Sequence, residues 1–327
     1  MQVVLTVLIV LLLCGCVSRN QAVETGTNEP VTVSFAVEAF KQGRYAESIT
    51  SYSTLLGEDD KDHKAFNGRG VAFLALDRNQ QALSDFKRAL SLAPQISDYH
   101  VNVSIVFLRL QQPEKALAEA DEAVRLNPLF ADALLARGVA LMHMEEYEEA
   151  LGSINRALIV EEKRQEQGLG KDEALYHSLL YYRAMAQQRV GLHEDSIRDY
   201  TTYIAAVKSG EKKAFAYANR GLCYLETGDM DKALDDLDIA VQLNLQDAMT
   251  YYDRGIVRQR RNELKKAIQD YTRAISHMPD FPEAYINRGS VRLILERTDQ
   301  ACHDFERACS KGFCGRLDSL REQGLCE

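Results

Sequence analysis

AFAYANRGLCYLETGDMDKALDDLDIAVQLNLQD, residues 214–247, is the stretch that decides the fold. Its first half carries apolar or small residues at spacings of three and four, which places them on one helical face: Tyr217, Gly221, Tyr224 and Leu225. A turn is predicted at Gly228, where that spacing stops. The second half resumes the spacing at Ala233, Leu237, Ala240 and Val241. The stretch therefore predicts a helical hairpin, in which small side chains at Gly221 and Ala233 let the two helices interlock.

The same pattern recurs along the chain. One such hairpin cannot bury its apolar face alone, so similar neighbours must cover it. Copies begin near residues 29, 63, 97, 131, 177, 214, 248 and 282. The first small position holds Ala36, Gly70, Ser104, Gly138, Ala184, Gly221, Gly255 and Gly289, and the second holds Ser48, Ala82, Ala116, Ala150, Ser196, Ala233, Ala267 and Ala301. Three second helices are predicted to end at Pro94, Pro128 and Pro279, because proline stops helix propagation.

These positions resemble those of the tetratricopeptide repeat over most of the 327 residues. The resemblance implies an all-α fold, a right-handed superhelical solenoid of about eight hairpins over residues 29–310. The fifth copy departs most from the pattern, because Gln187 and Tyr203 replace the usual aromatic residue and alanine. Before it, the polar segment EEKRQEQ (161–167) extends the preceding second helix. Either this is a tolerated surface insertion, or it forms a seam or lobe that contacts a partner.

The resemblance also implies that the first helix of each hairpin lines a concave groove. Its inward positions are mostly apolar here, and an exposed apolar strip in a groove commonly marks a partner site. The predicted groove comprises Asn67, Val71, Leu74, Val101, Ile105, Leu108, Leu135, Val139, Met142, Leu222, Tyr252 and Ile256. The alternative is that superhelical curvature or the N-terminal segment buries these side chains.

A row of arginines recurs one residue before the first small position, at Arg69, Arg137, Arg183, Arg220, Arg254 and Arg288. Aspartates recur in the second helices, at Asp85, Asp199, Asp236, Asp270 and Asp304. Their regularity predicts a structural ladder in which arginine stems pack between helices and the heads pair with the aspartates. A ligand-binding arginine row is the alternative.

The N-terminal residues 1–15 are predicted to be a lipoprotein signal peptide. Val3 to Leu13 is an apolar run that is too short to span a bilayer. The following Leu13-Cys14-Gly15-Cys16 resembles a bacterial lipobox, which implies lipidation at Cys16 and a cell-envelope location. Val17 favours the outer membrane, facing the periplasm, and residues 16–28 are predicted to be a flexible tether. An ordinary cleaved signal or a buried N-terminal helix is the alternative.

Four cysteines lie within the last repeat and the predicted C-terminal cap, residues 311–327. Cys302 and Cys309 lie seven residues apart, about 10 Å of helical rise, so they cannot pair with each other. If the chain after Gly312 folds back as a short helix, Cys309 meets Cys314 and Cys302 meets Cys326. Phe313, Leu317 and Leu320 are expected to cover the eighth hairpin. A zinc site is the rival prediction; the sequence also resembles the disulfide-bearing Sel1-like relatives of these repeats.

The composition excludes several function classes. The net charge of −9 argues against a general affinity for nucleic acid. No phosphate-binding loop, nucleophile elbow or zinc-protease motif occurs, so we expect no enzyme activity, cofactor, metal site or small-molecule substrate. The leading hypothesis is a lipid-anchored adaptor that binds proteins or peptides during envelope assembly or secretion. The alternative is an accessory subunit that holds a cell-wall or carbohydrate-active enzyme complex at the membrane.

Overall fold

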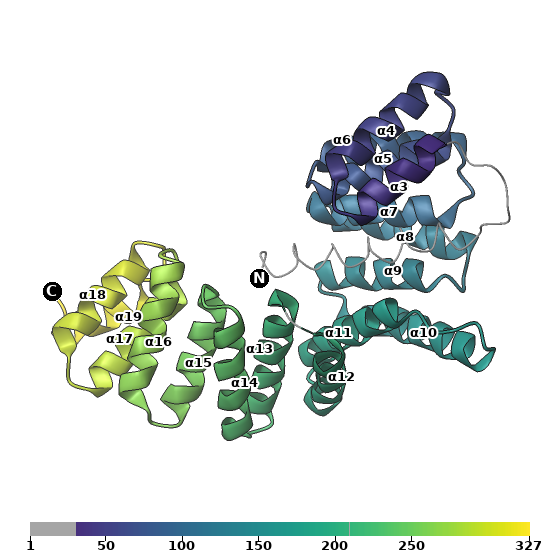
Figure 1. The fold of residues 1–327 in the computed structure, drawn as a ribbon. Helices are drawn as coiled ribbons and strands as arrows, with labels where there is room; N and C mark the ends of the chain where they lie inside the picture. Colours follow the sequence, from purple (N-terminus) through teal and green to yellow (C-terminus); the bar gives the residue numbers. More distant parts are fainter. Residues whose placement is uncertain (1–30, 209) are drawn as a thin grey trace. The chain divides into compact units, whose positions relative to one another are not determined.

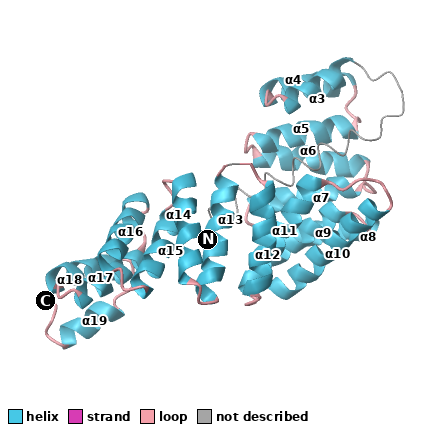
Figure 2. Ribbon diagram, turned by 60° about the horizontal axis from the view of Figure 1, so that its bottom comes forward, coloured by secondary structure: helices cyan, strands magenta, loops and turns pink. Residues whose placement is uncertain are grey.

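The computed structural model describes residues 31–208 and 210–327. Within these residues the chain forms seventeen helices and no strand (Figure 2). The all-α solenoid of helical hairpins that the sequence predicts is confirmed. None of the helices described here is both long and apolar enough to cross a bilayer. The predicted signal peptide, the lipidation site Cys16 and the tether lie outside the described residues.

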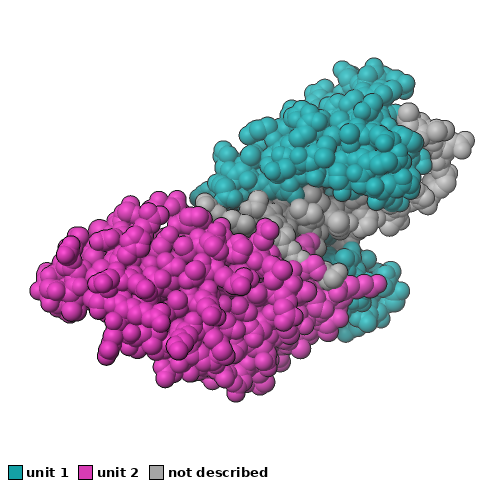
Figure 3. All heavy atoms as spheres, turned by 60° about the vertical axis from the view of Figure 1, so that its left-hand side comes forward, with its two compact units in different colours: residues 1–190 teal, residues 191–327 magenta. Residues whose placement is uncertain are grey.

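The chain divides into two compact units, residues 1–190 and residues 191–327 (Figure 3). The helices of unit 1 are α3 Val31–Lys41, α4 Tyr45–Glu58, α5 His63–Ala75, α6 Asn79–Leu92, α7 Ser97–Arg109, α8 Pro113–Leu126, α9 Ala131–His143, α10 Tyr147–Glu166 and α11 Glu173–Arg189 (Figure 1). Those of unit 2 are α12 His193–Ala206, α13 Glu211–Glu226, α14 Met230–Leu243, α15 Ala248–Arg260, α16 Leu264–His277, α17 Pro282–Ile294, α18 Thr298–Cys309 and α19 Gly315–Glu322. The boundary falls inside the divergent fifth repeat, between its first and second helices.

Small residues set the closeness of the two helices in each hairpin. A Cβ atom added to Gly255 would lie 2.6 Å from Cε1 of Tyr271 in the paired helix, and one added to Gly70 would lie 2.6 Å from Cε1 of Phe86. These distances are too short for any side chain, so the aromatic ring occupies the space that glycine leaves. The third hairpin has Ser104 instead, whose hydroxyl donates a 2.7 Å hydrogen bond to the Ala116 carbonyl.

Helix boundaries follow local sequence signals. Pro94, Pro128 and Pro279 each lie two residues after the last residue of a second helix, as predicted. At the start of α5, the carboxylate of Asp62 accepts hydrogen bonds from the backbone amides of Lys64 and Ala65. Such caps satisfy amides that have no partner within the helix.

The predicted arginine ladder is present in both units. Four arginines donate two hydrogen bonds each to the carboxylate of the aspartate sixteen residues later, in the pairs Arg69–Asp85, Arg220–Asp236, Arg254–Asp270 and Arg288–Asp304. The fourth repeat has Ser153 at the aspartate position, and Arg137 bonds its hydroxyl and the carboxylate of Asp121. Bidentate geometry between neighbouring helices fixes their relative register. These arginines are therefore structural.

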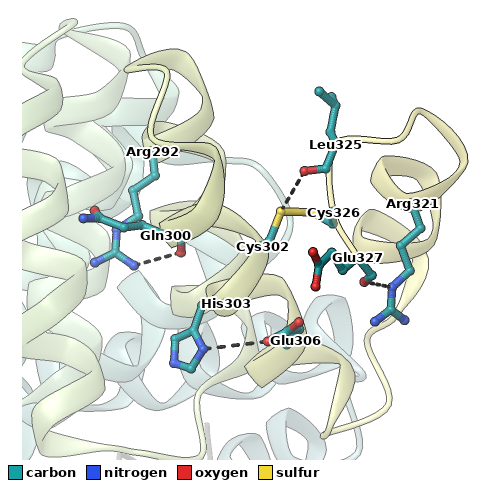
Figure 4. The surroundings of a disulfide bond; sticks show 9 residues. All are labelled: Arg292, Gln300, Cys302, His303, Glu306, Arg321, Leu325, Cys326 and Glu327. Atoms are coloured by element: carbon teal, nitrogen blue, oxygen red, sulfur yellow. Dashed lines mark hydrogen bonds and ion pairs between the residues drawn. A yellow bond between two sulfur atoms is a disulfide. The ribbon is translucent and has the colours of Figure 1, made fainter.

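The C-terminal cap contains the two disulfides expected from the sequence, Cys302–Cys326 and Cys309–Cys314. All four sulfurs are bonded in pairs, so no thiolate remains there for zinc. Figure 4 shows Cys302 joining α18 to the chain end at Cys326. Beside it, the Arg321 guanidinium donates to the Glu327 carbonyl at 2.6 Å.

The cap buries fewer of its apolar residues than expected. Leu317 and Leu320 of α19 are buried and pack against Phe305 of α18. Phe313 does not share this contact, because it lies before α19 and its side chain remains 47% exposed. Two leucines and two disulfides therefore hold the cap in place.

Candidate functional site

The predicted groove divides into a buried set and a partly exposed set. All members in unit 1 are buried: Asn67, Val71, Leu74, Val101, Ile105, Leu108, Leu135, Val139 and Met142. The remaining three, Leu222, Tyr252 and Ile256, belong to unit 2 and are only partly buried. The expectation of an exposed apolar strip is therefore wrong for unit 1.

Two first helices of unit 1, α7 and α9, are covered on almost every face. Eight consecutive residues of α7, Val101 to Leu108, are buried, and this run is longer than two helical turns. A buried hydrogen bond of 2.8 Å joins the Asn102 amide to the Asn67 carbonyl oxygen between α7 and α5. Side chains in such surroundings are part of the core. Spacing alone identifies the face that they share but not whether that face is covered.

In unit 2 the first helices α13, α15 and α17 contact one another in succession. We call the surface formed by Leu222, Tyr252, Asp253, Ile256 and Asn287 the inner face of unit 2; all five are partly buried. The Asn287 amide donates a 3.0 Å hydrogen bond to the Tyr252 hydroxyl and so links α17 to α15.

Aromatic packing fixes Tyr252 from behind. Its ring lies 4.7 Å from that of Phe281 and 5.8 Å from that of Tyr271, measured between centroids. Contacts of this kind orient aromatic rings in addition to burying their area. Tyr252 therefore presents a rigid, partly exposed ring with its hydroxyl held by Asn287.

Asp253, beside Tyr252, is a residue that sequence reasoning missed. Burial raises the pKa of its carboxyl to about 7, and the negative charge of Asp247 adds to the shift. Within residues 31–208 and 210–327, no hydrogen bond or ion pair to its carboxylate is present. One signal in the sequence could have identified it: the neighbouring repeats carry asparagine, Asn219 and Asn287, at the position where this repeat carries a charged aspartate.

The surroundings of Asp253 are acidic and aromatic. Burial, the charge of Asp253 and the charge of Glu283 together raise the pKa of Tyr252. Burial is also the main cause that raises the pKa of Tyr271, to which Tyr252 and Asp253 contribute. A cation placed here would neutralise Asp253 and lie next to an aromatic ring. The inner face of unit 2 is thus suited to a basic side chain flanked by apolar ones.

Two kinds of reactive group were predicted to be absent, an activated cysteine and a cluster of metal ligands, and the described residues bear on both. Cys223 is buried, its thiol donates to the Ser196 hydroxyl at 3.3 Å, and burial raises its pKa to about 11, so it is not an activated nucleophile. Among the residues described, no three His, Cys, Asp or Glu side chains gather as metal ligands.

Comparisons with known proteins agree with this fold. The sequence matches the family described as Tetratricopeptide repeat at residues 34–95, 104–166 and 181–248, more than half of the chain. None of the curated proteins matches the sequence.

Three solved structures share the arrangement of helices. A tetratricopeptide repeat protein from Parabacteroides merdae is 18% identical with a TM-score of 0.57, over 80% of this chain and 97% of that one. A chain of the APC/C hetero-tetramer Cut9–Hcn1 is 12% identical with a TM-score of 0.61 over 85% of this chain, which spans about half, 52%, of that chain. PilW, described as a widely conserved type IV pilus biogenesis factor, is 18% identical with a TM-score of 0.55, over 66% of this chain and 92% of that one. At these identities the likeness concerns the fold alone.

Proposed function

Because this chain belongs to the tetratricopeptide repeat family, whose members generally mediate protein–protein interactions, we propose that it is a non-catalytic adaptor that binds a peptide segment of a partner on the inner face of unit 2. The observation that carries the proposal is Asp253, a partly buried carboxylate without a hydrogen bond or ion pair among the described residues, beside the fixed ring of Tyr252. Such a group gains most from a ligand that brings the missing positive charge.

The partner segment carries a lysine or arginine next to apolar side chains. Its cation pairs with Asp253 and lies against Tyr252, while its apolar neighbours contact Leu222 and Ile256. Burial of aromatic and aliphatic surface supplies most of the binding energy, and the ion pair supplies orientation and specificity.

The test selects peptides against the purified chain. From a library of random 12-residue peptides, we expect enrichment of sequences with a basic residue beside apolar ones. Asp253→Asn and Tyr252→Ala should each lower the affinity for the selected peptides about tenfold. The control is Asp235→Asn, which removes an exposed carboxylate from α14 in the same unit and should leave the peptide affinity unchanged. Enrichment of acidic peptides, or binding that neither variant weakens, contradicts the proposal.

We further propose that the protein is lipid-anchored through Cys16 in the bacterial cell envelope, at the outer membrane facing the periplasm, and acts in envelope assembly or secretion. The lipobox-like Leu13-Cys14-Gly15-Cys16 supports the anchor. The two disulfides support an oxidising compartment. In the alternative, the same tethered protein is an accessory subunit that holds a cell-wall or carbohydrate-active enzyme complex at the membrane.

The anchor has its own test. Cys16→Ser should abolish labelling by a palmitate analogue and release most of the protein from the membrane fraction. Cys14→Ser is the matched control, because it alters the other cysteine of the same motif and should leave labelling intact. A parent protein that takes up no label rules out the lipid anchor without affecting the proposed peptide site.

A further inference from the structure

The interruption before the fifth repeat creates a second surface in unit 1, separate from the inner face of unit 2. The second helix α10 has 20 residues where α6, α8, α14 and α16 have 14. This helix and the loop before α9 line an open cavity of about 280 Å³, and the extension adds Lys163, Arg164 and Gln167 to the lining. The cavity has an apolar part formed by Leu129, Leu134 and Ile159 and a basic part formed by Arg156, Lys163 and Arg164.

Two of the apolar side chains occupy positions that are polar in most of the other repeats. Leu129 is 72% exposed, and the equivalent loop positions carry Gln95, Gln246 and Asp280. Ile159 is 49% exposed, and the equivalent positions carry Ser91, Arg125, Gln242, Ser276 and Ser310. The fold therefore does not require an apolar residue at either place. Leaving two large aliphatic side chains in water at one cavity is a feature of a binding surface.

The charge of the cavity is opposite to the net charge of the protein. None of the nine residues that line the cavity is acidic, although the net charge of the protein is −9. Arg156 and Lys163 are exposed and form no ion pair with any described residue. Arg164 has one carboxylate nearby, Glu161, at 3.7 Å.

The extension of α10 is held in place from its buried side. The Glu161 side chain is fully buried, and its Oε2 accepts a 3.1 Å hydrogen bond from the backbone amide of Asp172. This bond fixes the extended helix to the start of α11, so that Lys163 and Arg164 have a defined position beside the cavity. The site is thus built by ordered elements on both sides.

From this geometry we infer that the cavity binds a segment of a partner protein in which apolar side chains are flanked by aspartates or glutamates. The apolar side chains contact Leu129 and Ile159, and the carboxylates pair with Arg156 and Lys163. Charge complementarity identifies this partner chemistry, because the cavity offers unpaired cations and no anion. An anionic membrane is the less favoured occupant, because the apolar residues line a hollow and the cations beside it are few. The site is independent of the peptide site on unit 2 and prefers the opposite charge.

The test measures binding of a fluorescein-labelled, end-capped hexapeptide with two central leucines between pairs of aspartates, by fluorescence polarisation with the full chain. Two control peptides replace the leucines with serines or the aspartates with lysines. Each protein variant introduces a residue that the chain itself uses at the same repeat position: Leu129→Gln, Ile159→Ser and Arg156→Glu. The matched control is Leu245→Gln, which changes an exposed leucine in a loop of unit 2.

We expect the acidic peptide to bind and both control peptides to bind at least about tenfold more weakly. Ile159→Ser and Arg156→Glu should each weaken binding about tenfold at unchanged helical content, and added salt should weaken it further. Leu245→Gln and Asp253→Asn should have no effect, which separates this site from the one on unit 2. No saturable binding, or binding that neither Ile159→Ser nor Arg156→Glu weakens, overturns the inference. It is also overturned if phosphatidylglycerol vesicles bind in place of the peptide and Arg156→Glu abolishes that binding.

Discussion

Ile105 in unit 1 and Ile256 in unit 2 occupy the same repeat position on a first helix, yet their surroundings differ. Ile105 is fully buried within a helix that is covered on all sides, whereas Ile256 is partly buried beside Tyr252 and Asp253. The same repeat pattern therefore uses one position for packing in unit 1 and leaves it available for recognition in unit 2. The position of a residue in the repeat determines on which helical face its side chain lies. Whether that side chain packs in the core or can bind a partner depends on whether other helices cover that face.

The charged networks of the two units differ as well. In unit 2, Arg254 bonds both Asp238 and Asp270, and Arg258 adds a second arginine to Asp270. In unit 1, Arg69 bonds Asp85, while the equivalent Arg137 bonds the exposed Asp121. In unit 2, Asp270 thus accepts from two arginines within one hairpin, and Asp238 links that hairpin to the preceding one. Such networks fix geometry more than they add stability, because burying charge has its own cost.

The largest expected effect contrasts the two isoleucines. Ile105→Asn should destabilise unit 1 by at least about 4 kcal/mol, because it removes buried apolar surface and leaves an amide without a partner. Ile256→Asn should destabilise unit 2 by only about 1 kcal/mol, because part of its side chain already reaches water. Hydrogen exchange detected by mass spectrometry reports each unit separately.

Peptide binding completes that comparison. Ile256→Asn should weaken binding of the peptides that carry a basic residue beside apolar ones, while unit 2 stays folded. If Ile105→Asn leaves the exchange of α7 unchanged, the buried face of unit 1 is not a core and the contrast between the units fails.

Much of this architecture is predictable because it depends on spacing. Glycine at position 255 must face a large ring at position 271, and proline at 279 must follow the end of a helix, whatever surrounds them. Helical rise excludes a bridge between Cys302 and Cys309, but the pairs found also require the chain after Gly312 to fold back.

The candidate sites depend on features that spacing does not contain. Whether Val101 is accessible depends on what covers α7, a property of the tertiary structure. Asp253 looks like one more acidic residue until its burial and lack of partners are known. Similarly, Leu129 and Ile159 lie 30 residues apart and line one cavity, to which Lys163 and Arg164 are added only because α10 is extended.

The second prediction concerns the covalent cap, which the described residues of unit 1 lack. Cys302→Ser with Cys326→Ser opens a bridge between residues 24 apart and should destabilise the end of unit 2 by about 3 kcal/mol. Cys309→Ser with Cys314→Ser is the control, because that bridge closes a loop of only 5 residues and should matter less. Exchange should rise in α17, α18 and α19 and stay unchanged in unit 1; equal loosening of both units would contradict the division.

A smaller effect is expected from Asp253. The pKa of its carboxyl is about 7 in the folded state, so between pH 4 and pH 7 the folded state binds more protons than the unfolded state. Unit 2 therefore loses stability as the pH rises through this range. Asp253→Asn should remove the loss and stabilise unit 2 at pH 8 by about 2 kcal/mol, less than the full shift implies because the side chain partly reaches water. Asp235→Asn serves as the control, and a variant that is less stable at pH 8 would show that the charge is compensated.

The smallest effect has the opposite sign and belongs to unit 1. Burial lowers the pKa of His143 to about 4, and its Nε2 has no hydrogen-bond partner among the described residues. The unfolded state therefore binds more protons between about pH 6.5 and pH 4, and unit 1 loses stability as the pH falls through this range. His143→Leu should remove about 1 kcal/mol of that loss at pH 5.5. His100 acts against it, because the hydrogen bond to Glu119 raises its pKa, so only the difference between parent and variant isolates His143. Denaturation of both proteins at pH 7.5 and pH 5.5 measures this difference; an equal loss in the two would exclude His143 as the source.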